Sequence, residues 1–177
     1  FTFARAEDAA DVVLDYPRTM QSVRKFFLPP REKLLHFDLK ENSAAPAKAE
    51  PVDAIFLGVH SYDLAALHRL DYNFSQGQAE RNYLTRRQGA LFVGVSFEPD
   101  KDHFCGSLGD TGGFDVFLTK LLAGYVGETI TPAGEGLLRG FDLPPHEAGK
   151  PAAKPFQQHI YVPQNRLGDV MSHSYDN

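Results

Sequence analysis

Residues 54–70, AIFLGVHSYDLAALHRL, decide the fold of this chain. The first six are apolar and rich in strand formers, as in a buried parallel strand. After Asp63, leucine and alanine recur at helical spacing, which predicts a helix. Ser61 or Asp63 is suited to cap that helix, and we favour Asp63. The turn at residues 60–63 would then lie where open α/β sheets bind ligands, outside the carboxyl end of a strand.

A second unit of the same kind follows. Residues 90–95, ALFVGV, form another apolar run, and residues 79–88 between the two runs have a helical pattern. This arrangement predicts a right-handed crossover between parallel strands. Residues 114–130 are typical of an antiparallel hairpin, with a helix over 115–122 as the competing interpretation. The predicted fold class is therefore α/β, a small mixed sheet with central parallel strands, flanking helices and a β-hairpin.

The rest of the chain divides at a proline-rich stretch. We predict an α/β domain over residues 1–141 and a proline-rich linker over 142–177. Within the domain, 36–39 has the alternation of a strand. Residues 40–52 are polar with two prolines and predict a surface loop. Residues 132–136 predict a turn, and the stretch just after them is ambiguous.

Composition excludes several classes of function. The formal net charge of −5, with no basic block, argues against nucleic acid and anionic membranes as partners. The single cysteine, Cys105, permits no intrachain disulfide and no all-cysteine metal site. No apolar run is long enough to span a membrane and no signal peptide is visible, so we expect a cytoplasmic protein without membrane insertion.

Few side chains suggest catalysis or metal binding. The seven histidines are scattered without a paired spacing, which argues against zinc. His103 and Cys105 could be read as base and nucleophile, but no third group that would orient them is identifiable. Arg86 and Arg87 suit the carboxyl end of a helix. We interpret them as a solvated helix end, with docking of an acidic partner as the alternative.

Four stretches carry a resemblance to a known family. In order they are residues 14–38 (LDYPRTMQSVRKFFLPPREKLLHFD), 58–74 (GVHSYDLAALHRLDYNF), 83–95 (YLTRRQGALFVGV) and 103–121 (HFCGSLGDTGGFDVFLTKL). Together they resemble the amino-terminal domain of the β subunits of cytoplasmic sulfhydrogenases and of the A subunits of anaerobic sulfite reductases.

The resemblance implies an electron-carrying subunit. In full length such subunits end in a ferredoxin-like domain with two [4Fe-4S] clusters, so we expect that domain to be missing beyond the linker. The implied partners are other subunits of a redox complex, flavoprotein or hydrogenase subunits. The chain itself would be a non-catalytic subunit of an oxidoreductase.

The departures from the family concern its cysteines. The family pattern at the first turn is Gly-Val-Arg-Pro-Cys-Asp-Leu, and Tyr62 stands here at the cysteine. After the second strand the family has Asn-Cys, where this chain has Phe97. The later Cys-Phe-Cys of the family becomes His103, Phe104 and Cys105, so only Cys105 is retained.

An iron–sulfur cluster is normally held by four thiolates, so we expect none in this segment. Because the four positions lie on three loops, we expect them to converge at the carboxyl edge of the sheet, with His60 and Asp63 as neighbours. Tyr62 and Phe97 would fill the space with aromatic bulk. The expected function is that of a cluster-free docking or structural domain, with neither catalytic residues nor metal ligands.

Two other hypotheses stay open. The first is a stand-alone small-molecule binding module or enzyme that uses the vacated pocket. Its lining would be His60, Tyr62, Asp63, His103 and Cys105. The second is a purely structural remnant.

Overall fold

A five-stranded mixed sheet forms the centre of the molecule. The structure is a computed structural model, and it describes residues 1–99, 101–103, 112–139 and 159–163. The strands lie in the order β3-β4-β5-β6-β7; the first three are mutually parallel and the rest pair antiparallel. Their bounds are β3 Ile55–Val59, β4 Leu91–Val95, β5 Val116–Leu121, β6 Gly124–Thr129 and β7 His159–Pro163. The predicted α/β class and both parallel strands are confirmed, but β3 lies at the edge of the sheet and only β4 is central.

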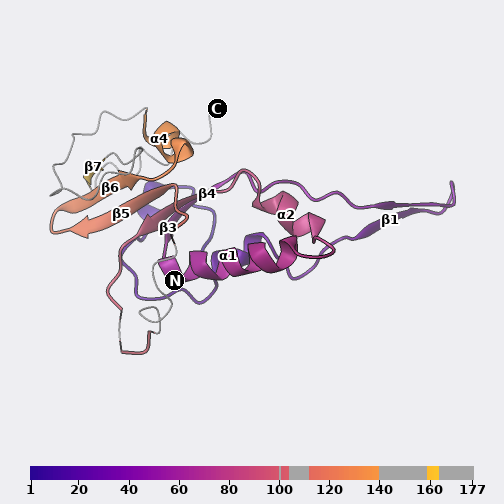
Figure 1. Ribbon diagram of the computed structural model, residues 1–177, viewed down its shortest axis with the longest axis horizontal. Coiled ribbons are helices and arrows are strands. Elements are labelled where there is room, and N and C mark those ends of the chain that lie inside the picture. The colour runs from indigo at the N-terminus through magenta and orange to yellow at the C-terminus, as the bar shows by residue number, and fades with distance from the viewer. Residues whose placement is uncertain (100, 104–111, 140–158, 164–177) are drawn as a thin grey trace.

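Helices cover both faces of this sheet. The α-helices are α1 Ser61–Ser75, α2 Arg81–Arg87 and α4 Pro132–Leu138, and the 3-10 turns are η1 Ala9–Asp11 and η2 Val23–Phe26. In Figure 1, α1 and α4 lie on opposite sides of the strands. No helix in the described part of the chain is long and apolar enough to cross a lipid bilayer.

The hairpin prediction for residues 114–130 is confirmed, and the competing helix over 115–122 is wrong. β5 pairs with β4 on one side and β6 on the other, so its backbone groups are used by the sheet. The buried residues Val116 and Leu118 alternate with more exposed neighbours, as expected for a strand.

The predicted turn at 132–136 is also wrong, because a helix occupies it. Thr131 caps α4 by accepting a hydrogen bond from the Gly134 amide at 3.1 Å. Pro132 occupies the first turn, where its missing N–H costs nothing. A local cap thus starts a helix despite two glycines that disfavour it.

The predicted strand near 36–39 exists, and the predicted loop over 40–52 is only partly a loop. β1 Leu35–Asp38 pairs antiparallel with β2 Ser43–Pro46 in a separate two-stranded sheet. Figure 1 shows this hairpin reaching away from the rest of the molecule. Its turn is held by Asp38, whose carboxylate accepts from the amides of Lys40 and Glu41.

Each face of the main sheet has its own apolar core. On β4, Phe92 belongs to the core under α1, whereas Val93 and Val95 belong to the opposite one. The first core consists of Val23, Phe27, Phe56, Val59, Leu64, Leu67, Tyr83, Phe92 and Phe114. The second consists of Leu14, Val93, Val95, Val116, Leu118, Tyr125 and Leu138. This alternation explains why residues 90–95 read as a continuous apolar run.

The arginine pair at the end of α2 is not a solvated helix end, so that interpretation is wrong. Arg87 forms two hydrogen bonds of 2.8 Å to the Asp71 carboxylate on α1, and its guanidinium lies 5.0 Å from the ring centroids of Phe27 and Phe92. Arg86 pairs with Glu32 and donates to the Phe27 carbonyl. Burial alone would raise the pKa of Asp71, but the hydrogen bonds from Arg87 and Tyr83 outweigh it and the pKa is lowered.

Replacing Asp71 with asparagine should lower the free energy of unfolding at neutral pH by about 2 kcal/mol, because Arg87 would stay largely buried without its charged partner. The folded-state pKa of Asp71 lies below its unfolded value. The stabilisation is therefore present above the unfolded pKa and is lost as the pH falls through the folded one. Urea unfolding at neutral pH and at about pH 3 measures both effects.

The matched control is Glu135→Gln, which breaks the exposed pair between Glu135 and Arg139. It should change stability by less than about 0.5 kcal/mol. Equal effects of the two substitutions would show that the Asp71 pair contributes no more than a surface contact.

Candidate functional site

The candidate site begins with a bulge at the end of β3. The pairing of β3 with β4 shifts register between Leu57 and Val59. Gly58 sits there with φ of +78°, a conformation that L side chains rarely adopt. Its carbonyl accepts a hydrogen bond of 2.5 Å from the Tyr16 hydroxyl. The bulge places Val59 in the same core as Phe56, and the chain then turns into α1 through His60.

His60 is fully buried between two aromatic rings. It stacks on Tyr16 with ring centroids 4.1 Å apart and an interplanar angle of 13°. On its other side it stacks on Phe97, with centroids 4.3 Å apart at 17°. The three rings come from the amino-terminal segment, the β3–α1 turn and the segment after β4. This stack therefore joins two carboxyl ends of parallel strands to a segment remote in the sequence.

Tyr62 and His103 complete the group. The Tyr62 ring meets Phe97 edge-on at 5.4 Å and 87°, and it lies 5.8 Å from the His103 ring. His103 lies 5.4 Å from Phe97. Tyr62, Phe97 and His103 thus converge at one place at the edge of the sheet. Cys105, the fourth position predicted to join them, lies outside the described residues.

The imidazole of His60 is held neutral. Its Nδ1 lies 2.9 Å from the Tyr62 hydroxyl, and its Nε2 has no hydrogen-bond partner among the described residues. Burial, and secondarily the charge of His103, lowers the pKa of His60 to about 4. Burial also raises the pKa of Tyr16, with Tyr62 and Asp63 adding to the effect. At neutral pH the stack consequently carries no charge.

Asp63 is not the helix cap that the sequence suggested. His60 occupies the cap position, and its side chain makes no capping bond. Asp63 lies in the first turn of α1 and is 5% exposed, with Oδ2 lacking a hydrogen-bond partner in the described part of the chain. Burial raises the pKa of this carboxyl, and Ser22, Thr19 and Arg24 offset part of the rise. The Asp63 side chain packs near η2 and therefore does not cap α1, as it could in a solvated helix.

The donor set of the site does not fit an iron–sulfur cluster. The described residues contain no thiol at the site, and no group of three or more His, Cys, Asp or Glu side chains among them could hold a metal ion. Aromatic rings in van der Waals contact occupy the point where Tyr62, Phe97 and His103 meet. The arrangement can pack and fix three loops, and it offers one neutral imidazole and one buried carboxyl.

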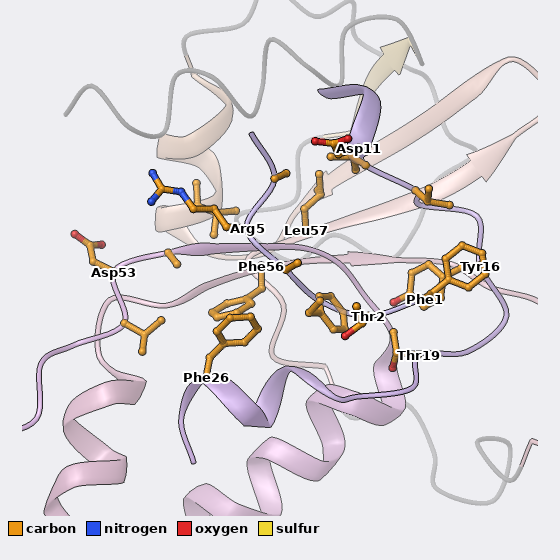
Figure 2. A pocket seen from close by; sticks show the side chains of 18 residues that line it. Phe1, Thr2, Arg5, Asp11, Tyr16, Thr19, Phe26, Asp53, Phe56 and Leu57 are labelled. Atoms are coloured by element: carbon orange, nitrogen blue, oxygen red, sulfur yellow. The ribbon is translucent and has the colours of Figure 1, made fainter. Parts of the chain in front are cut away.

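A cavity of about 580 Å³ adjoins the stack at Tyr16. In Figure 2, Leu57 of the edge strand β3 lies beside Arg5, Phe56 points the opposite way toward Phe26, and Phe1 lies beside Tyr16. Neither Tyr62 nor His103 lines this cavity. The hollow space near the site is therefore distinct from the pocket that the small-molecule hypothesis placed around those residues.

Sequence reasoning missed Tyr16. The residue lies 44 positions before His60 and shows no motif of its own beyond its place in the stretch LDYPRT. Only the path of the amino-terminal segment along β3 brings its hydroxyl to Gly58 and its ring to His60.

The lowered pKa of His60 predicts acid sensitivity. As the pH falls from about 6.5 towards 4, the unfolded chain binds a proton at this residue that the folded chain does not, so stability decreases. The loss should be on the order of 2 kcal/mol. Asp63 acts in the opposite sense at the acid end, because its folded pKa is raised. His60→Phe keeps an aromatic ring in the stack and removes the titration.

Unfolding free energies measured between about pH 5 and pH 7 should therefore vary less in His60→Phe than in the natural chain. The control is His36→Phe, at an exposed position on β1, which should leave the profile unchanged. Parallel profiles for the natural chain and His60→Phe would rule out His60 as the source.

Comparison with known proteins agrees with the resemblance noted in the sequence. The chain is 33% identical over 129 residues to "Sulfhydrogenase 2 subunit beta" of Pyrococcus furiosus. The matched part is 71% of this chain but only 38% of that protein. No family model and no solved structure matches the chain. We conclude that the chain is a distant homologue of part of a sulfhydrogenase β subunit.

Proposed function

We propose that this chain is part of an electron-transfer subunit of a cytoplasmic hydrogenase-type complex, and that the described segment is its cluster-free docking and structural domain. The homology to a protein named as a sulfhydrogenase subunit supports the placement in a redox complex. The partners would be hydrogenase or flavoprotein subunits that carry the catalytic centres. An assignment to a sulfite reductase-type complex rests on the sequence resemblance alone.

The observation that carries the cluster-free role is the ring packing at the carboxyl edge of the sheet. The sequence resemblance implies that Tyr62, Phe97 and His103 stand at cysteine positions of the family, and the rings of these three residues contact one another. A [4Fe-4S] cluster needs four thiolates and the volume of an iron–sulfur cube. Here the rings of three side chains lie together, and none of the three carries a thiol.

The ring stack can replace the mechanical role of a cluster. A cluster bound by several loops would fix them relative to one another. In this chain the stack of Tyr16, His60 and Phe97 connects the same sheet edge to the amino-terminal segment. We infer that the stack fixes these segments relative to one another without a metal cluster.

Electron carriage would then fall to another part of the protein. The resemblance places two [4Fe-4S] clusters in a ferredoxin-like domain after residues 142–177, and this division of the chain stays a prediction. The described domain would position that part against the other subunits. A cysteine-rich continuation of the reading frame beyond Asn177 would support this arrangement.

Iron analysis tests the cluster-free role. The 177-residue chain, purified without oxygen and reconstituted with ferrous iron and sulfide, should bind essentially no iron and show no visible absorbance from an iron–sulfur cluster. The triple variant Tyr62→Cys, Phe97→Cys, His103→Cys restores the family pattern beside Cys105. It should bind about four irons per chain.

A stoichiometric cluster on the natural chain would overturn the cluster-free role. The conservative control Tyr62→Phe, Phe97→Tyr changes the same positions without adding thiols and should stay iron-free. This control separates an effect of new ligands from an effect of loosened packing.

A further inference from the structure

The hairpin of β1 and β2 is the most exposed part of the described chain. All eight residues of the two strands are exposed, and the hairpin projects away from both cores (Figure 1). Phe37 is 63% exposed and Leu39 is 92% exposed. We call residues 33–48 the arm. A two-stranded sheet standing alone is marginally stable in water, so an arm of this kind requires a stabilising contact.

Between Leu35 and Asp38 the two faces of the arm differ in polarity, although the exposed Leu34 precedes β1 on the side of His36. The register sets Leu35 opposite Pro46 and Phe37 opposite Ala44, and side chains alternate along a strand. Leu39 lies in the turn that follows β1 and is also exposed. The opposite face carries His36 and Asp38, with Ala45 and Ser43 across from them. An antiparallel sheet with this alternation normally buries its apolar face, yet no other described element covers it here.

Lysines mark the base of the apolar face. The Ala47 amide donates to the Leu34 carbonyl at 2.9 Å, which extends the register by one residue. Lys33 and Lys48 come directly next to these two residues in the sequence, outside the paired strands, and both are exposed. The base of the arm therefore carries two positive charges, which complement a carboxylate on the rim of an apolar surface.

The same charges disfavour two other occupants. If two copies of the arm packed apolar face to apolar face in parallel, four lysines would meet. In the antiparallel orientation each lysine pair would face the apolar tip at Leu39. A membrane surface is disfavoured because Lys33, Lys40 and Lys48 are offset by Asp38 and Glu41 within the arm, which leaves an excess of one positive charge. Anionic lipid is recognised by clusters of roughly four to eight lysines and arginines.

We propose that the arm docks a different subunit of the redox complex. Leu35, Phe37 and Leu39 lie in an apolar groove of that subunit, and a carboxylate on the rim of the groove pairs with Lys33 and Lys48. This inference rests on the proposed function, since it names the element through which the domain would hold its partner. The groove binds the arm by burying apolar side chains, and the acidic rim fixes its orientation.

Affinity purification from the native host tests the inference. The full-length protein is tagged and purified, and mass spectrometry quantifies the hydrogenase-type and flavoprotein subunits that accompany it. Phe37→Asp places a charge in the centre of the apolar face and should reduce their recovery about tenfold or more. His36→Asp is the matched control on the opposite face and should leave recovery unchanged. Both variants should keep the natural melting temperature, because neither side chain belongs to a core.

Zero-length coupling of amines to carboxylates tests the rim. Carbodiimide treatment of the purified complex should link Lys33 or Lys48 to an acidic residue of a hydrogenase or flavoprotein subunit. Links between Lys33 or Lys48 and a second copy of this chain would overturn the inference. So would binding of the arm to vesicles of phosphatidylglycerol and phosphatidylcholine that Phe37→Asp abolishes.

The outcomes separate the arm from the proposed function. If the natural protein recovers redox subunits and Phe37→Asp recovers them equally well, the proposed function stands and the arm inference is wrong. If the natural protein recovers no redox subunit, the proposed function itself fails, and the arm inference with it.

Discussion

The rest of the site depends on the burial of His60 between Tyr16 and Phe97. A histidine at this depth must be neutral, because no described group is placed to compensate a charge on its ring. The neutral ring can then stack like any other aromatic. It joins three segments: the amino-terminal segment, the turn after β3 and the segment after β4. The hydrogen bond from the Tyr16 hydroxyl to the Gly58 carbonyl holds the amino-terminal segment at the same edge of the sheet.

The stack in turn requires the bulge at Gly58. Successive side chains of a strand point to opposite faces, so Phe56 and Val59 could not share a core in a regular strand. The register shift allows it, and the Tyr16 hydroxyl satisfies the carbonyl at the bulge. On β4, the Phe114 ring packs closely against the backbone of Gly94. A Cβ at this position would lie 2.6 Å from the ring, so a larger residue would not fit without a shift. Both glycines thus serve packing within a few residues of the site.

The two surfaces of the molecule have contrasting character. The carboxyl edge of the sheet is filled by packed rings, whereas the arm presents apolar side chains to solvent. Two largely buried ion pairs hold α2 in place. Arg87 pairs with Asp71 on α1, and Arg86 pairs with Glu32, which directly precedes the arm.

The sequence by itself determined the parallel strands β3 and β4, the helices α1 and α2 between them, and the β5–β6 hairpin. Apolar runs and alternation reflect burial directly, so these elements could be recognised from local pattern. It also placed Tyr62 and Phe97 at equivalent turns. Only the tertiary structure decided that Tyr16 joins His60, that Asp63 is buried and not a cap, and that Arg87 is held by Asp71. These contacts join segments that are far apart in the chain. A local sequence pattern does not indicate which distant side chain will stack on a buried ring or pair with a buried charge.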